Sequence, residues 1–206
     1  MGLYSHHIFP RLLDWSLGTA MIGEQRMETL APISGRVLEI GFGTGLNLPA
    51  YPDGVTDLST IDPEQMLPQR VANRIAAAPF PVNQFRLDAG RRLPFADDTF
   101  DGVVTTFTLC SIPDVGSALL EIRRVLKPDG KYVFLEHGRS DDPKVARRQD
   151  RLNPIQKFIA RGCHVNRPIA ELILGANLRL VRIERYLMPD TPRILGEMYR
   201  GEAVKD

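Results

Sequence analysis

Acidic residues and glycines gather behind three consecutive apolar runs in the first half of this chain. They are Glu39, Gly41, Gly43, Gly45, Asp62 and Asp88. Carboxylates can hold an ammonium group and can accept hydrogen bonds from sugar hydroxyls or from the exocyclic amine of a base. Closely spaced glycines let the backbone come near a ligand because no Cβ stands in the way. These residue types therefore predict a binding site for a nucleoside-like ligand.

Two kinds of ligand are compatible with the glycines. A dinucleotide site has the pattern G-x-G-x-x-G, whereas here the spacing is G-x-G-x-G and the third glycine comes one residue early. Asp62, which lies 21 residues after Gly41, fits the ribose of either ligand. Glu39, placed to hold an ammonium, and Asp88, placed with Ala89 at the adenine amine, favour an adenosyl ligand without phosphates. Acids at strand ends are also common helix caps, but three acids in register with the glycine loop are much harder to explain as caps.

The hydrophobic pattern predicts the elements that position these residues. As far as residue 137 we expect strands over 36–40, 56–61, 82–87, 100–107 and 132–137, and helices over 46–50, 64–77 and 115–126. After that point we expect helices over 143–161 and 167–174 and strands over 178–186 and 196–204. The alternation implies an α/β fold with parallel strands and right-handed crossovers, and the two late strands suggest an antiparallel pair at the sheet edge.

We expect one domain over residues 1–206. It would consist of an N-terminal helical segment (1–32), a ligand-binding core (36–138) and substrate-side helices with the final strand pair (139–206).

Composition narrows the possible partners and compartments. The net charge of +1 offers no overall electrostatic match to nucleic acid. Cys110 and Cys163 lie far apart and without metal-ligand spacing, which is typical of free thiols in a reducing compartment. No run of 18 apolar residues and no signal-peptide pattern occurs, so we expect a cytoplasmic protein. Residues 137–193 carry 12 Lys/Arg against 6 Asp/Glu, a local basic excess.

Several ordered motifs then resemble a known family. VLEIGFGTGLN, DPEQM, LDAG, LPFADDTFDGVVTTFTLCSIPD and ALLEIRRVLKPDGKYVFLEHG resemble class I S-adenosylmethionine-dependent methyltransferases of the UbiE-like type. The resemblance covers about residues 36–138. It implies a Rossmann-like, doubly wound seven-stranded sheet of order 3-2-1-4-5-7-6 with strand 7 antiparallel, an N-terminal helical lid, and S-adenosyl-L-methionine as the methyl donor. The usual turn KPGG reads KPDG here, a change that we expect to be harmless.

Segments outside this core are similar to two narrower groups. FIARGCHVNRP and GEAVK resemble mammalian membrane-associated alkyl thiol methyltransferases, and LYSHHIFPRLLDWSLG resembles bacterial proteins related to phospholipid N-methyltransferases. The mammalian relatives have an apolar N-terminal anchor that this sequence does not show, which argues against membrane residence.

By position, the resemblance implies a set of ligand contacts. Glu39, Gly41, Phe42, Gly43 and Gly45 would surround the methionine part, Asp62 and Pro63 the ribose, and Met66, Asp88 and Ala89 the adenine, while Phe107, Leu109 and Cys110 would line the methyl-donor pocket. Met66 could equally be a core residue on a helix face.

The chemistry of methyl transfer indicates a candidate base and candidate substrate contacts. His137, at the end of a strand, is placed to accept a proton from a thiol. It could be oriented or charged by Glu136, or it could be an ordinary polar strand end that caps the next segment. Candidate substrate contacts are Tyr4, His7, Cys110, His164 and Arg167. Cys163 and His164 lack further ligands at a suitable spacing, so no metal is expected, and Asn166 is expected to cap the following helix.

A small-molecule thiol or other soft nucleophile is the first expected acceptor. An aminophospholipid headgroup or a quinone-like ring carbon is the alternative. Lys144, Arg147, Arg148 and Arg151 share one helical face, which is either a solvated surface or a peripheral contact with an anionic membrane.

Other classes of function are less consistent with the motifs. An NAD-dependent oxidoreductase would need the dinucleotide spacing, and a nucleic-acid methyltransferase a different motif where FTLCSIPD stands. A non-catalytic module that binds the nucleoside would predict loss of Glu39, Asp62 or a glycine. The oligomeric state is left open.

Overall fold

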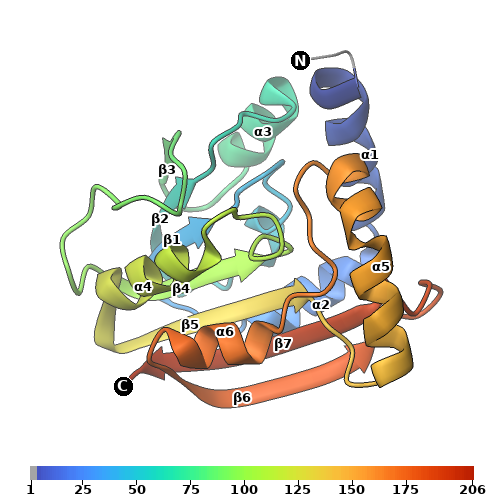
Figure 1. Cartoon of the computed structure of the whole chain (residues 1–206). Helices are drawn as coiled ribbons and strands as arrows, with labels where there is room; N and C mark the ends of the chain where they lie inside the picture. Colours follow the sequence, from blue (N-terminus) through green and yellow to red (C-terminus); the bar gives the residue numbers. More distant parts are fainter. Residues whose placement is uncertain (1–3) are drawn as a thin grey trace.

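Seven strands form one twisted sheet at the centre of the molecule. In the computed structural model, which describes residues 4–206, their order is β3-β2-β1-β4-β5-β7-β6 (Figure 1). The strands are β1 Gly35–Ile40, β2 Val55–Ile61, β3 Val82–Phe85, β4 Phe100–Thr106, β5 Leu126–His137, β6 Leu178–Leu187 and β7 Glu197–Lys205. β7 is antiparallel to both of its neighbours, whereas the other pairs are parallel. The strand order and the antiparallel edge pair expected from the sequence are confirmed.

Helices cover both faces of the sheet. They are η1 Tyr4–Ile8, α1 Phe9–Leu17, α2 Ala20–Leu30, η2 Leu48–Ala50, α3 Pro68–Ala76, α4 Val115–Val125, α5 Pro143–Ile159 and α6 Ile169–Gly175. Figure 1 shows α4 and α6 in front of the sheet and α2 behind it. Leu119 of α4 and Ile173 of α6 belong to one buried cluster, and Leu30 of α2 and Val71 of α3 belong to another. Within residues 4–206, no helix is long and apolar enough to cross a bilayer.

The helices α1 and α5 lie beyond the carboxyl ends of the parallel strands (Figure 1). The hydroxyl of Tyr4 donates to the carbonyl oxygen of Ile159 at 3.0 Å, so the start of the chain meets the end of α5. The guanidinium of Arg161 lies 5.6 Å from the ring centre of Phe9, which adds a cation–π contact at the same place. This end of the sheet is where ligands bind in doubly wound folds.

Side-chain caps fix where the helices around this end begin. Thr19 accepts a hydrogen bond from the amide of Ile22 at the start of α2, and Asp142 accepts one from the amide of Lys144 at the start of α5. Each cap satisfies an amide that the first helical turn leaves without a partner.

Two expected boundaries were wrong because prolines and tertiary pairing override local pattern. The helix expected over 64–77 begins only at Pro68, since proline restricts the preceding residue and Leu67 has a φ of +43°. The strand expected over 132–137 begins at Leu126, so the KPDG turn lies inside β5, where Leu126 pairs with Phe100 across an irregular register.

The predicted cap of α6 was also wrong. The residue that precedes this helix is Pro168, and the side-chain amide of Asn166 instead donates to Asp150 of α5 at 2.9 Å. In the N-terminal segment, the helical pattern divides into two helices at Gly18 and Thr19.

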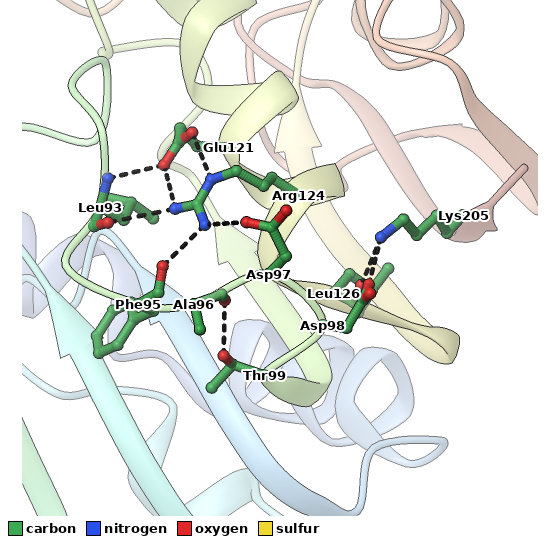
Figure 2. A network of polar contacts seen from close by, with 10 residues as sticks. All are labelled: Leu93, Phe95, Ala96, Asp97, Asp98, Thr99, Glu121, Arg124, Leu126 and Lys205. Carbon is green, nitrogen blue, oxygen red and sulfur yellow. Dashed lines mark hydrogen bonds and ion pairs between the residues drawn. The ribbon is translucent and has the colours of Figure 1, made fainter.

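One arginine fastens the loop before β4 to α4. Figure 2 shows Arg124 donating to both carboxylate oxygens of Glu121 at 2.8 and 2.7 Å and to Asp97 at 2.8 Å. The same guanidinium donates to the carbonyl oxygens of Phe95 at 2.8 Å and Leu93 at 3.2 Å. The acidic partners raise the pKa of Arg124 above its ordinary value. This network fixes the segment that follows Asp88.

We expect Arg124→Gln to lower the free energy of unfolding by about 2 kcal/mol, because it removes charge-assisted bonds and leaves two loop carbonyls without a donor. Urea denaturation measures the change. The control is Arg91→Gln in the same loop, where an exposed arginine makes no ion pair in the described part of the chain and the change should stay within about 0.5 kcal/mol. Equal losses in both variants would contradict the assignment.

Candidate active site

A cavity of 690 Å³ opens at the carboxyl ends of the parallel strands. Predicted site residues that line it are Glu39, Gly41, Phe42, Gly43, Asp62, Pro63, Met66, Asp88, Ala89, Phe107, Cys110 and His137. These residues follow β1, β2, β3, β4 and β5 in turn, so the parallel arrangement alone brings them to one edge.

The first two positions of the loop after β1 that carry glycine require it for different structural reasons. Gly41 has a φ of +81°, and a Cβ there would lie 2.0 Å from Oγ1 of Thr108. Gly43 has a φ of +57°, but a Cβ there would meet only a carbonyl oxygen at 4.0 Å. The first glycine is therefore required by contact with the loop after β4, whereas the second leaves open space on the cavity side.

Glu39 is buried at the end of β1 and held by two donors. Its Oε1 accepts from the side-chain amide of Asn47 and its Oε2 from the hydroxyl of Tyr51, each at 2.8 Å. Burial raises the pKa of Glu39 to about 7, although these hydrogen bonds and the nearby charge of Arg26 act in the opposite direction. Each oxygen retains a lone pair for a further partner.

Arg26 of α2 is the buried cation of this group. It donates to Asn47 at 2.6 Å and to Oγ1 of Thr106 at 2.8 Å, and its guanidinium lies 5.4 Å from the ring centre of Phe107. Burial lowers the pKa of Arg26 to about 10. Its Nε has no hydrogen-bond partner among the described residues. Sequence reasoning missed Arg26 and Asn47; Asn47 stands in the glycine motif, but nothing in the sequence of α2 indicates Arg26.

The acids after β2 and β3 are anchored by backbone amides. Asp62 accepts from the amides of Gly43 and Glu64, one on each carboxylate oxygen, at 2.8 Å. Burial raises the pKa of Asp62 above its ordinary value. Asp88 accepts from the amide of Gly90 at 2.9 Å. Met66 precedes α3 and lines the cavity, so it is not a core residue on a helix face.

The loop after β4 has a strained start that β5 holds in place. Phe107 has a φ of +53°, which is unusual for a bulky residue and costs about 1–3 kcal/mol. Its amide donates to the carbonyl oxygen of Leu135 at 2.8 Å, and the amide of Thr108 donates to Oε2 of Glu136 at 2.9 Å. Glu136 therefore supports this loop rather than orienting the His137 ring, because successive strand residues point to opposite faces. Its charge nevertheless acts on His137 and helps to raise the pKa of that imidazole. Burial raises the pKa of Glu136 to about 8.

Two thiols and an imidazole come together at the inner end of the cavity. The Sγ atom of Cys163 lies 3.0 Å from Nε2 of His137 and 3.6 Å from Sγ of Cys110. All three atoms lie within 4.8 Å of one another, a grouping that could hold a metal ion. The sequence argument against a metal rested on spacing, and the fold removes that argument because the donors come from three separate segments.

The charges of this thiol–imidazole cluster are mutually dependent. The hydrogen bond from Cys163 and the nearby imidazole hold the pKa of Cys110 well below its ordinary value, despite burial. Burial lowers the pKa of His137, but the charge and hydrogen bond of Cys110 outweigh it and leave the pKa above the ordinary 6.5. The hydrogen bond with Cys110, burial and the charge of Cys110 raise the pKa of Cys163 above its ordinary value.

Six predicted site residues do not line the cavity: Gly45, Leu109, Tyr4, His7, His164 and Arg167. The guanidinium of Arg167 donates to the carbonyl oxygens of Leu109 and, at 2.7 Å, Ile112, so it fastens the loop after β4. His164 contacts the side chain of Asn153 at 3.0 Å. Tyr4 and His7 are exposed on the N-terminal segment, away from its cavity face.

The apolar wall of the cavity comes mostly from residues that sequence reasoning missed. These are Phe9, Leu13 and Leu17 of α1, Ile22 of α2, Met188 and Met198. Phe9, Leu13 and Leu17 recur at helical spacing, so one face of α1 covers the site. The hydrophobic pattern alone predicts an amphipathic helix, whereas its position over the site was expected only from the resemblance, which implies an N-terminal helical lid.

The fold and the site together define a doubly wound α/β protein with a largely apolar ligand cavity at the carboxyl ends of its parallel strands. The family model described as a methyltransferase domain matches residues 38–134. The chain is 32% identical to thiol S-methyltransferase TMT1B of Rattus norvegicus over 82% of this chain and 70% of that one. It is also 32% identical to phosphatidylethanolamine N-methyltransferase of Cereibacter sphaeroides over 73% of this chain and 71% of that one.

A solved structure extends the fold comparison. A putative methyltransferase in complex with the Haloferax volcanii Trm112 activator is 18% identical, with a TM-score of 0.68 over 95% of this chain and 92% of that one. The chain belongs to the class I S-adenosylmethionine-dependent methyltransferases. It is an enzyme of this class, and its methyl donor is S-adenosyl-L-methionine. The resemblance in the sequence motifs is thereby confirmed.

We expect Gly41→Ala to destabilise the fold, since a Cβ would lie 2.0 Å from Oγ1 of Thr108 and the positive φ adds about 1–2 kcal/mol. Thermal unfolding measures the loss. The matched control is Gly23→Ala in α2, where a Cβ meets nothing within 4 Å and stability should rise by roughly 0.5–1 kcal/mol. A Gly41→Ala protein as stable as the parent would show that the loop after β1 differs from this description.

Proposed function

We propose that this enzyme transfers a methyl group to the sulfur of a small apolar thiol. The observation that carries the proposal is the contact of Cys163 with Nε2 of His137 at the inner end of a mainly apolar cavity. That contact puts a thiol at hydrogen-bond distance from an imidazole, which is the arrangement that an acceptor thiol needs. The similarity to thiol S-methyltransferase TMT1B supports the same acceptor class.

The residues on the donor side fit S-adenosylmethionine. Its amino-acid end carries both charges, and Glu39 and Arg26 offer an anion and a cation that line the same cavity. Both oxygens of Asp62 have a lone pair available for the ribose hydroxyls beyond their amide contacts. The open space at Gly43 leaves room for the ligand where a side chain would fill it. Met66 and Asp88, with Ala89, would contact the adenine, and Phe107 would lie beside the methyl group.

The catalytic work of the chain is orientation and removal of one proton. When bound, the donor supplies an electrophilic methyl group and leaves as S-adenosylhomocysteine. The acceptor thiol gives its proton to His137, and its sulfur gains the methyl group as a thioether. Burial among apolar side chains excludes water, and fixed orientation of the reacting atoms can lower the barrier by roughly 7–11 kcal/mol.

An aminophospholipid is the second candidate acceptor. The similarity to phosphatidylethanolamine N-methyltransferase and the basic residues of α5 favour it. An amine, however, is best held by a carboxylate. The described carboxylates that line the cavity, Glu39, Asp62, Glu64 and Asp88, lie on the donor side, whereas the cluster at the inner end is Cys110, His137 and Cys163.

The test is a comparison of acceptors with methyl-labelled S-adenosylmethionine. Alkyl thiols, sulfide, phosphatidylethanolamine vesicles and a quinol are supplied separately, and labelled product is measured. We expect label on an alkyl thiol, with the specificity constant rising with chain length because the cavity wall is apolar. Transfer to the lipid or to the quinol but to no thiol would overturn the proposal.

We expect His137→Gln to lower kcat/KM for alkyl thiols by about 10²–10⁴-fold. In the parent enzyme, kcat/KM should fall as the pH drops through the pKa of His137, which lies above 6.5, because the protonated imidazole can no longer accept a proton. Initial rates are measured against pH with two thiols of different acidity.

The two thiols separate the role of His137 from ionisation of the acceptor itself. In the parent, the acidic limb should occur at the same pH for both thiols. In His137→Gln it should shift with the acidity of the thiol. His164→Gln is the matched control, since His164 lies outside the cavity lining. An acidic limb that follows the thiol in the parent as well would exclude His137 as the base.

A further inference from the structure

Bulky apolar side chains are exposed on the two helices that wall the cavity. They are Ile8, Leu12, Trp15, Ile155, Phe158 and Ile159, which we call the apolar rim. Trp15 is 76% exposed and Phe158 is 87% exposed. Isolated exposed apolar residues are ordinary, but a group of this size on adjoining helices marks an interaction surface.

The rim is the outer side of helices whose inner side lines the site. On α1, Leu12 and Trp15 face outward, whereas Phe9, Leu13 and Leu17 line the cavity. On the last two turns of α5, Ile155 and Phe158 face outward, whereas Gln156 lines the cavity. The hydrogen bond between Tyr4 of η1, the turn that precedes α1, and Ile159 ties the start of this N-terminal segment to the end of α5. The rim therefore lies at the cavity wall rather than at a remote surface.

The first half of α5 carries basic side chains, whereas its second half carries the α5 residues of the apolar rim. Lys144, Arg147, Arg148 and Arg151 are exposed, and in the part of the chain that the structure describes none of them makes an ion pair. We call these four residues the basic stripe. Asp150 does not offset them, because it is paired with Arg139 at 2.6 Å.

This pairing of features fits a lipid surface better than another protein. Interfacial helices place apolar side chains at the boundary between headgroups and acyl chains, and Lys and Arg beside anionic headgroups. An anionic bilayer supplies negative charge opposite the basic stripe, whereas a second copy of this chain would have to place acidic side chains there.

We propose that the apolar rim and the basic stripe form a docking surface for a bilayer that contains anionic lipids, with the cavity wall held against the interface. An apolar or amphipathic acceptor would then reach the cavity between α1 and α5 without crossing bulk water. The inference goes beyond the proposed function and does not depend on which atom is methylated.

The chain carries its own probe, because Trp15 is its single tryptophan and belongs to the rim. Trp15 fluorescence and co-sedimentation are measured with vesicles of phosphatidylcholine, alone and with added phosphatidylglycerol. With the anionic vesicles we expect a blue shift, quenching by brominated acyl chains, and binding that weakens as salt is raised. With phosphatidylcholine alone, binding should be much weaker.

Matched variants separate the surface from general charge and hydrophobicity. The double variant Arg147→Gln with Arg148→Gln should lower the partition coefficient about fivefold for each charge removed. Arg91→Gln with Arg92→Gln, which removes the same charge elsewhere, should leave it unchanged. Phe158→Ser should lower it at least tenfold, whereas Leu120→Ser, at an exposed position of α4, should not. Figure 1 shows α4 on the opposite side of the molecule from α5.

Three outcomes would overturn the proposal: no blue shift with anionic vesicles, equal losses in the variants and their controls, or a blue shift that grows with protein concentration in the absence of vesicles. The last result would indicate that a second copy covers the rim. Far-UV circular dichroism and thermal unfolding of Phe158→Ser, compared with the parent, check that this variant folds. Because docking is measured without methyl transfer, its failure is distinct from failure of the proposed function.

Discussion

A carboxylate buried at the end of a central strand is the constraint on which the donor side of the site depends. Glu39 is only 1% exposed, and burial of a charge must be compensated by hydrogen bonds or an opposite charge. Asn47 and Tyr51 supply the hydrogen bonds, and Arg26 supplies the charge. These partners come from α2 and from the chain that follows the glycines. The need to compensate the buried carboxylate of Glu39 therefore also determines the path of the loop after β1 and the position of α2.

The sequence was sufficient to predict the position of a site residue where that position follows from strand order alone. Parallel strands bring their carboxyl ends to one edge, so acids and glycines that directly follow apolar runs could be placed in one site without any knowledge of side-chain contacts. Arg26 could not be found in this way, because its position depends on how α2 packs behind the sheet. Likewise Cys110 and Cys163 are separated by 53 residues, and their contact depends on the loop after α5 folding back over the loop after β4.

Two neighbouring residues of β5, Glu136 and His137, point to opposite faces of the strand and make different contacts. Glu136 accepts from the amide of Thr108 and holds a turn that begins with the strained Phe107, whereas His137 faces the thiols. The strain is maintained because the adjacent strand binds both amides of the turn. Alternation along the strand thus gives the two polar residues at its end different neighbours, although the charge of Glu136 still helps to raise the pKa of His137.

The two helices beyond the sheet explain how a small chain can have both a closed apolar pocket and an exposed apolar surface. An α-helix is only about 10 Å across, so residues on its opposite faces can meet different environments. Phe9 and Leu13 complete the pocket wall while Leu12 and Trp15 remain outside it. If the outer face rests on a bilayer, the lipid covers apolar surface that otherwise lies in water, and the wall of the pocket becomes the shortest path between acyl chains and the reacting atoms. The contacts of Tyr4 and Arg161 with the neighbouring helix would then determine how readily that path opens.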